Sequence, residues 1–241
     1  MQWDQLSRPG DRPVNEDCVG VFEAENSRCF VVADGLGGHG RGDEASRLAV
    51  EAFGTVWSGQ GPSSPKEGLL EAFCQAQRKL MEEQRRLCCP SQMKTTTAAL
   101  VVQDDQVVWS HIGDSRVYGF SRGKVRMRTL DHSVPELLVR SGEIREKDIR
   151  FHPDRNRLLR VLGVPEAESR FELAAAQPLS RFDAFLLCSD GFWELITEKE
   201  MGALLRRASS PHAWLSQMAE KVEEHGKGHD MDNYSAVAII L

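Results

Sequence analysis

Helical segments occur in pairs along this chain, and that pairing limits its possible folds more than any other feature of the sequence. Apolar residues at a helical period predict four helices, over 43–57, 65–87, 198–208 and 211–224. Ser210 is placed to cap the last of them, and Pro211 suits its first turn. A parallel sheet of strand–helix–strand units needs single helices between successive strands, so paired helices exclude that class of fold.

The segments around the helix pairs have the character of β-strands. Eight short apolar runs are predicted to be strands, over 19–22, 28–33, 98–102, 107–112, 117–120, 125–128, 184–188 and 236–241. The polar stretches 103–106 and 121–124 separate neighbouring runs and are typical of turns in an antiparallel meander. So many strands are expected to form two packed antiparallel sheets, with one helix pair covering each. The predicted fold class is therefore α+β, with four αββα layers in a single domain spanning residues 1–241.

Length, charge and cysteine spacing narrow the class of protein. The 241 residues contain no run of about 18 apolar residues, and the first residues lack the pattern of a signal peptide, so we expect no membrane association. The six cysteines form no Cys-x-x-Cys motif and several lie in apolar runs, which favours reduced thiols in a cytoplasmic protein. The formal net charge of −6 argues against general binding to nucleic acid.

Acidic residues stand where the predicted strands end or begin. These residues are Glu16, Asp17, Asp34, Asp114, Asp190 and Asp232. Strands can bring several carboxylates to one place, where they repel one another and lose hydration, so such clusters persist mainly when a cation compensates them. Hard oxygen ligands suit Mg²⁺ or Mn²⁺ rather than zinc. The pattern therefore predicts a metal-dependent hydrolase whose acidic centre binds more than one ion.

The segment after Asp34 is unusually rich in glycine. Five glycines occur among the eight residues 35–42, immediately before a predicted helix. Glycine permits a close approach of the backbone, which would let the Gly35 carbonyl reach the same cation as Asp34. The alternative is a flexible connector between strand and helix, but a connector alone rarely needs so many glycines.

Positive charge is concentrated between Lys124 and Arg160. This stretch holds ten Lys or Arg against six Asp or Glu, a local balance of +4. A solvated helical face explains such a charge run, and a basic lip that receives an anionic substrate explains it equally well. We keep both interpretations, because the stretch is also the least regular part of the sequence.

Eight motifs in order along the chain resemble one known family. They are RxxNED from Arg12, VADGLGGHGRGDEAS, TTTAAL, HIGDSR, LDHS, HPDRNRLLRVLG, LLCSDGFWE and DNYSAVAI. The set covers nearly the whole chain after Arg12 and resembles the bacterial branch of the metal-dependent PPM/PP2C serine/threonine protein phosphatases. The resemblance implies a β-sandwich with helices on both sides, in agreement with the strand and helix pattern.

The resemblance also implies a set of metal ligands. Those of the first ion are Asp34, the Gly35 carbonyl, Asp190 and Asp232. Glu16 and Asp34 resemble the ligands of the second ion, so that Asp34 bridges the two. Asp114 with Asp190 resembles a third, weaker site. Asp17 and Asn233 resemble residues that stand behind the ligands, where Asp17 would hold metal-bound water.

The implied reaction is hydrolysis of phosphoserine and phosphothreonine on proteins. Two Mn²⁺ or Mg²⁺ ions would lower the pKa of a shared water, which attacks phosphorus directly without a phosphoenzyme. Arg12 would grip the phosphate oxygens with its planar guanidinium. His39 is the candidate donor of a proton to the departing alkoxide, since imidazole titrates near neutral pH.

Residues 132–155 resemble the mobile flap of that family. Arg145, Lys147 and Arg150 in this segment are expected to recruit the phosphoprotein. The expected setting is a monomeric, cytoplasmic phosphatase that opposes a bacterial Ser/Thr kinase. The alternative is a pseudophosphatase that binds phosphoproteins or a regulator without turnover. Cysteine-dependent phosphatases are excluded because no His-Cys-x5-Arg motif occurs.

Overall fold

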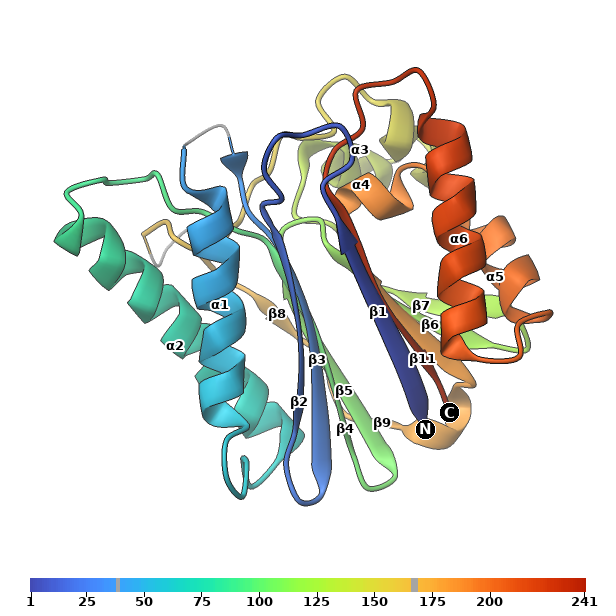
Figure 1. Cartoon of the computed structure of the whole chain (residues 1–241), viewed down its shortest axis with the longest axis horizontal. Helices are drawn as coiled ribbons and strands as arrows, with labels where there is room; N and C mark the ends of the chain where they lie inside the picture. The colour runs from blue at the N-terminus through green and yellow to red at the C-terminus, as the bar shows by residue number, and fades with distance from the viewer. Residues whose placement is uncertain (38–39, 166–168) are drawn as a thin grey trace.

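The computed structural model describes residues 1–37, 40–165 and 169–241. Two antiparallel sheets pack face to face, and helices cover both outer faces (Figure 1). The first sheet has the order β1 (Gln2–Arg8), β11 (Tyr234–Ile240), β10 (Ala184–Cys188), β6 (Arg116–Ser121), β7 (Lys124–Arg128). The second has the order β2 (Asp17–Glu23), β3 (Ser27–Asp34), β4 (Thr97–Gln103), β5 (Gln106–Ile112), β8 (Glu172–Leu173), and β9 (Gln177–Pro178) also pairs with β5. The predicted α+β, four-layer architecture is confirmed.

Each sheet carries one pair of helices on its outer face. Helices α1 (Gly42–Val56) and α2 (Pro65–Arg86) lie on the second sheet, and α5 (Glu198–Leu205) and α6 (Pro211–Gly226) on the first (Figure 1). The predicted cap of α6 is confirmed, because Ser210 Oγ accepts the Ala213 N–H at 3.1 Å. The shorter elements are α3 (Val134–Ser141), α4 (Asp190–Trp193) and the 3₁₀ helices η2 (Glu146–Phe151) and η3 (Leu179–Arg181).

Three apolar layers hold the four structural layers together. Along β3, Cys29 and Val31 point to α1 and α2, whereas Phe30 and Val32 point to the first sheet. The side chains of β10 and β11 alternate in the same way. One set packs between the two sheets, and the other packs toward α5 and α6. Because strand side chains alternate between faces, a strand buried on both sides is apolar throughout. That explains the continuous apolar runs in the sequence.

Strand β1 was not predicted from the sequence. Its residues are mostly polar, and its two large apolar side chains, Trp3 and Leu6, are three positions apart and so face opposite sides. The strand lies at the edge of the first sheet and pairs with β11 alone. An edge strand contacts fewer neighbours, so it needs no apolar alternation to form.

The segment 132–155 is more regular than its sequence suggests. Ser133 caps α3 by accepting the Glu136 N–H, and Gly142 ends the helix in the left-handed conformation at φ 82°. The 3₁₀ helix η2 follows directly. The expectation of an irregular stretch between Lys124 and Arg160 is therefore wrong for residues 134–151, whereas residues 152–160 contain no helix or strand. The start and stop residues of a helix of eight residues were the overlooked signal.

All six cysteines are free, and three of them, Cys29, Cys89 and Cys188, are buried. Within the described ranges, no helix combines the length and the apolar character needed to cross a bilayer.

Candidate functional site

Strand direction brings the acidic residues to one end of the sandwich. In the antiparallel ladders, β3, β5 and β10 end at this edge, whereas β2 and β11 begin there (Figure 1). Asp34 is the last residue of β3, Asp114 and Asp190 follow β5 and β10 by two residues, and Asp232 precedes β11 by two. Five strands from different parts of the sequence therefore bring their ends together at the same edge.

A cavity of about 610 Å³ opens at this edge. Its lining contains every predicted metal ligand together with Arg12: Arg12, Glu16, Asp34, Gly35, Asp114, Asp190 and Asp232. The remaining lining comes from residues near the glycine-rich turn and from Asn156 and Leu158. The structure thus brings together the whole ligand set expected from the sequence.

Glycines let the backbone close tightly around Glu16. A Cβ on Gly37 would lie 1.8 Å from Glu16 Oε2, and one on Gly42 would lie 2.8 Å from Glu16 Oε1. A Cβ on Gly35 would lie 2.1 Å from the Gly42 carbonyl oxygen. At Gly35 and Gly42 the obstructing atoms include backbone atoms, so these two positions require glycine. A side chain at Gly37 would displace the Glu16 carboxylate. Glycine in this turn therefore lets the backbone pack closely beside the acidic cavity.

Two threonines directly before β4 hold the Asp34–Gly35 turn through hydrogen bonds. The Thr96 N–H donates to the Asp34 carbonyl at 2.9 Å, and the Asp34 N–H donates to Thr96 Oγ1 at 3.3 Å. Thr95 Oγ1 donates to the same carbonyl at 2.8 Å. Both threonines are fully buried, so the position of Asp34 is determined by the start of the neighbouring strand.

Burial makes the carboxylates costly in the absence of a cation. Loss of hydration, followed by repulsion from neighbouring carboxylates, holds the pKa of Asp34 and Asp114 well above the usual range. Burial likewise raises the pKa of Asp190. Positive charge in the cavity would favour the charged forms of these carboxyl groups. A divalent cation supplies that charge, and the donors are all hard oxygens of the kind that Mg²⁺ and Mn²⁺ prefer.

Asp17 gives independent support for the same conclusion. Its Oδ2 accepts a hydrogen bond from Ser189 at 2.7 Å, but its buried Oδ1 has no hydrogen-bond partner in the structure. Burial raises the pKa of Asp17 to about 7. A buried acceptor without a donor is rare in folded proteins and suits a residue that accepts from metal-bound water. The geometry is compatible with the position behind the ligands expected for Asp17.

The carboxylates line the cavity without forming a tight cage. Among the described residues, the one group of three His, Cys, Asp or Glu with ligand atoms all within 4.8 Å of one another lies elsewhere. Spaced carboxylates fit Mg²⁺ and Mn²⁺ better than a cation that needs many direct protein ligands. Mg²⁺ in particular keeps several waters and takes only one or two carboxylates directly.

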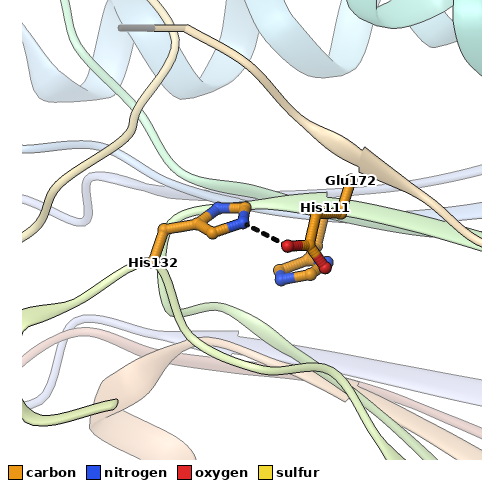
Figure 2. A group of neighbouring side chains, drawn as sticks. All are labelled: His111, His132 and Glu172. Atoms are coloured by element: carbon orange, nitrogen blue, oxygen red, sulfur yellow. Dashed lines mark ion pairs between the residues drawn. The ribbon is translucent and has the colours of Figure 1, made fainter. Parts of the chain in front are cut away.

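That other group consists of His111, His132 and Glu172, which converge in Figure 2. The Gly113 N–H donates to His132 Nδ1 at 3.2 Å, so the neutral ring carries its proton on Nε2. This N–H lies 3.4 Å from Glu172 Oε1 and so has no lone pair for a cation. The two imidazole rings are also stacked, at 4.7 Å and 10°, so their in-plane lone pairs do not meet. We therefore do not assign a metal to this cluster.

The histidine pair instead secures the turn that carries Asp114. His111 Nε2 donates to the Leu130 carbonyl at 2.7 Å, and the backbone N–H of His132 donates to the Gly113 carbonyl at 2.8 Å. Together with the Gly113–His132 side-chain bond, these contacts join residues 130–132 to the end of β5. Asp114 is held from outside the cavity in this way.

A buried aromatic and ionic group supports Asp114 and Asp190 from the other side, and the sequence did not reveal it. Trp193 of α4 donates from Nε1 to the Asp114 carbonyl at 3.0 Å. The Arg116 guanidinium lies 3.3 Å from the centre of the Trp193 ring and binds both oxygens of Asp131 at 2.8 and 2.6 Å. Arg116 and Asp131 lie in the motifs HIGDSR and LDHS. Neither motif showed that the two side chains pair, because the pairing depends on the fold.

Arg12 lies at the cavity but is already engaged. Its Nε and Nη2 donate to Asp232 at 3.2 and 3.4 Å, and its Nη1 donates to Asp230 at 3.0 Å. Asn233 anchors the loop that carries Arg12, because its Nδ2 donates to the Pro9 carbonyl and its Oδ1 accepts the Glu16 N–H. Phosphate binding by Arg12 would use its remaining N–H donors or exchange a carboxylate partner.

Arg145, Lys147 and Arg150 do not line the acidic cavity. His39 lies outside the described residues. A second cavity adjoins the acidic one. Arg145 is exposed and paired with Asp148, and Lys147 lines neither cavity. Arg150 lines the neighbouring cavity, but its side chain is only 7% exposed and is bound within the protein. The expected basic lip is therefore not one surface: Arg145 and Lys147 are exposed, whereas Arg150 is bound inside the protein.

The stability of the metal-free protein should depend on pH because of these buried acids. The pKa of Asp17, about 7, and those of Asp34 and Asp114 are raised, so their protonated forms favour folding, and stability is lost as pH rises through them. Burial lowers the pKa of His111 and His132, which opposes this trend only below about pH 6.5. Between pH 6.5 and 8 we expect the Tm in EDTA to fall by roughly 5–10 °C.

Differential scanning fluorimetry with and without Mn²⁺ measures this dependence. The increase in Tm that Mn²⁺ produces should grow over the same pH range, because a cation replaces the protons that the acids lose. A Tm in EDTA that stays constant or rises from pH 6.5 to 8 would contradict the buried-acid account.

Comparison with known proteins places this geometry in a family. Residues 11–233 match the family described as Protein phosphatase 2C. The serine/threonine phosphatase stp of Listeria welshimeri serovar 6b is 36% identical over 202 residues, covering 81% of this chain and 79% of that protein. Protein phosphatase PhpP of Streptococcus pneumoniae serotype 2 is 30% identical over 195 residues, covering 79% and 78%.

Solved structures show the same fold. Serine/threonine phosphatase Stp1 from Staphylococcus aureus has a TM-score of 0.88 at 24% identity, over 100% of this chain and 95% of that one. The catalytic domain of the serine threonine protein phosphatase PstP, solved with two manganese ions, has a TM-score of 0.80 at 22% identity, over 99% and 97%. With the family match over most of its length and its acidic cavity, this chain belongs to the protein phosphatase 2C family.

Proposed function

We propose that this protein is a metal-dependent phosphatase that hydrolyses phosphoserine and phosphothreonine on proteins. The observation that carries the proposal is the convergence of Glu16, Asp34, Asp190 and Asp232 on one cavity, with the unpartnered Asp17 oxygen behind them. The names of the relatives from Listeria and Streptococcus support it, since both are protein phosphatases.

The chain supplies ligands for two Mn²⁺ or Mg²⁺ ions and for a third, weaker one. Asp34, the Gly35 carbonyl, Asp190 and Asp232 would hold the first ion, Glu16 and Asp34 the second, and Asp114 with Asp190 the third. When bound, such ions activate a water for in-line attack on phosphorus and neutralise charge on the phosphate. Among the described residues that line the cavity there is no serine, cysteine or histidine that could form a phosphoenzyme. Direct hydrolysis assigns the carboxylates to the metal ions rather than to nucleophilic attack.

Individual side chains complete the proposed reaction. Arg12 binds the phosphate oxygens when its guanidinium exchanges Asp230 or Asp232 for the substrate. Asp17 and Asn233 act behind the ligands: Asp17 accepts hydrogen bonds from bound water, and Asn233 holds the Glu16 backbone. His39 remains the proposed proton donor to the leaving alkoxide.

The alternative is a pseudophosphatase that binds phosphoproteins without turnover. Loss of catalysis in such a protein would be expected to remove one or more carboxylates from the cavity. Every carboxylate predicted to bind a metal ion is present and lines the acidic cavity, which favours the active enzyme.

Hydrolysis of a phosphothreonine peptide by the purified protein tests the proposal. We expect phosphate release with Mn²⁺ or Mg²⁺ and none with EDTA. A folded protein that binds Mn²⁺, as shown by its raised Tm, but releases no phosphate would shift the assignment to the pseudophosphatase. The proposed setting is a cytoplasmic monomer that acts on the phosphoprotein products of a Ser/Thr kinase.

The basic residues of segment 132–155 are expected to contribute unequally to recognition of the phosphoprotein. Substitution of the exposed Arg145 and Lys147 by Ala should raise KM about two- to fivefold for a phosphoprotein, but not for p-nitrophenyl phosphate. Arg150→Ala should instead lower the Tm, because it removes bonds to the Trp193 and Ile196 carbonyls. Equal changes in KM for both substrates in the Arg145 and Lys147 variant would rule out the recruiting role.

A further inference from the structure

A second cavity of about 550 Å³ adjoins the acidic one. The two share Arg12, Asn156, Asp190 and Asp232 in their linings, so a chain bound in one continues directly into the other. The second cavity extends away from the metal ligands, between the end of η2, the turn after α4 and the end of α6. Its position suits the part of a substrate that flanks the phosphorylated residue.

Phe151 lies at the rim of this second cavity and is 84% exposed, more than any other large apolar residue described in the chain. Leu195 and Met231 add apolar surface to the same lining. A single exposed apolar residue needs no explanation on its own. An exposed aromatic ring at the rim of a cavity that opens into the catalytic one is typical of a binding position.

The backbone on both sides of Phe151 is fastened to the protein. Ile149 is 1% exposed and lies in the core, and Arg150 donates to the Trp193 and Ile196 carbonyls and to Glu198 at 3.1, 3.3 and 2.7 Å. On the other side, Arg155 pairs with Glu194 at 3.0 Å. The ring of Phe151 is therefore presented from a fixed segment, which reduces the entropy lost when a ligand binds.

Each arginine that lines the second cavity is paired within the protein, and the lining holds five carboxylates against three arginines. Arg12 pairs with Asp230, Arg155 with Glu194, and Arg150 with Glu198. An acidic flank on a substrate would have to displace one of these internal carboxylates. An apolar side chain needs no such exchange and gains contact with Phe151 and its neighbours. Chemistry in this cavity thus favours an apolar residue over an acidic one.

We propose that this cavity binds an apolar side chain of the phosphoprotein, close in sequence to the phosphorylated residue, against the ring of Phe151. The inference rests on the proposed phosphatase function and specifies the class of substrate. Phe151 acts as a specificity residue in this account and takes no part in the chemical step.

A set of phosphothreonine peptides tests the inference. One leucine is moved along an otherwise polar sequence on either side of the phosphothreonine, and the parent peptide carries serine at every position. The enzymes compared are the wild type, Phe151→Ala, Phe151→Leu and, as control, Leu70→Ala. Leu70 is also an exposed apolar residue, at 49%, but lies on α2 and lines neither cavity. The measured quantity is kcat/KM, with p-nitrophenyl phosphate as the substrate that has no flank.

At one or more leucine positions we expect kcat/KM to exceed that of the parent peptide by about tenfold in the wild type and in Leu70→Ala. The advantage should disappear in Phe151→Ala and be largely kept in Phe151→Leu, while hydrolysis of p-nitrophenyl phosphate stays unchanged in all four enzymes. This crossing of enzyme and peptide changes isolates the pairwise contact.

Two results would overturn the inference while leaving the phosphatase intact. One is the same kcat/KM for every leucine position, and the other is a leucine advantage that persists in Phe151→Ala. A loss of p-nitrophenyl phosphate hydrolysis in Phe151→Ala would also overturn it, by showing a structural role. Failure of the wild type to hydrolyse any peptide or p-nitrophenyl phosphate with Mn²⁺ would overturn the proposed function itself, and this inference with it.

Discussion

Asp34→Asn and Asp190→Asn are each expected to lower kcat/KM for a phosphothreonine peptide by about a hundredfold to a thousandfold or more. Each substitution keeps the shape of the side chain but removes its negative charge and one of its two oxygen ligands. Both residues line the acidic cavity, where charge and ligand number determine how tightly a hard cation is held.

The same variants carry an internal check on folding. Because burial and mutual repulsion raise the pKa of both carboxyl groups, their neutral replacement should leave the Tm in EDTA unchanged or higher. The increase in Tm produced by Mn²⁺ should shrink at the same time. Asp105→Asn, in the exposed turn between β4 and β5, is the matched control and should change neither quantity. Full activity of Asp34→Asn or Asp190→Asn would exclude that residue from the metal centre.

Asp131→Asn is expected to lower the free energy of unfolding by about 3–5 kcal/mol, because it leaves the Arg116 charge buried without its main partner. Both side chains are 1% exposed, and the two hydrogen bonds between them measure 2.8 and 2.6 Å. In a chain of this size the Tm should fall by roughly 10 °C. Chemical denaturation with urea measures the change in free energy directly.

Activity should fall together with stability in this variant. Arg116 stacks on Trp193, which donates to the carbonyl of Asp114, so a displaced guanidinium disturbs a predicted metal ligand. Asp148→Asn provides the comparison, since it breaks the exposed pair with Arg145 and should leave the stability nearly unchanged. Similar Tm values for the Asp131 and Asp148 variants would show that burial adds nothing to the Arg116 pair.

The sequence predicts the fold well, and places the candidate ligands at one edge of the sandwich, because strand ends follow local rules. Asp34 and Asp190 each follow a strongly apolar strand, and strand direction then determines which edge they reach. The strands with continuous apolar runs were all found, since burial on both faces produces that pattern. Strand β1 was overlooked because an edge strand can form with mixed polar residues.

The supporting contacts could not be predicted, because they join residues that are distant in sequence. Trp193 reaches Asp114 across 79 positions, and Arg116 reaches Asp131 across 15. The local excess of positive charge also gave no sign of the internal role of Arg150, which was expected to belong to a basic surface. In the fold its guanidinium meets the Trp193 and Ile196 carbonyls, and no sequence pattern reports where unpaired carbonyls will lie.

The place of β11 in the first sheet has a consequence for synthesis on the ribosome. Strand β11 lies between β1 and β10, and β1 has no other partner among the described strands. At ~5–20 residues per second, β1 waits on the order of ten seconds or more for its neighbour to be made. Asp232 and the strand that positions it arrive in that same last step. A nascent chain therefore cannot assemble the metal centre early, and prematurely terminated chains should be unfolded and inactive rather than partly active.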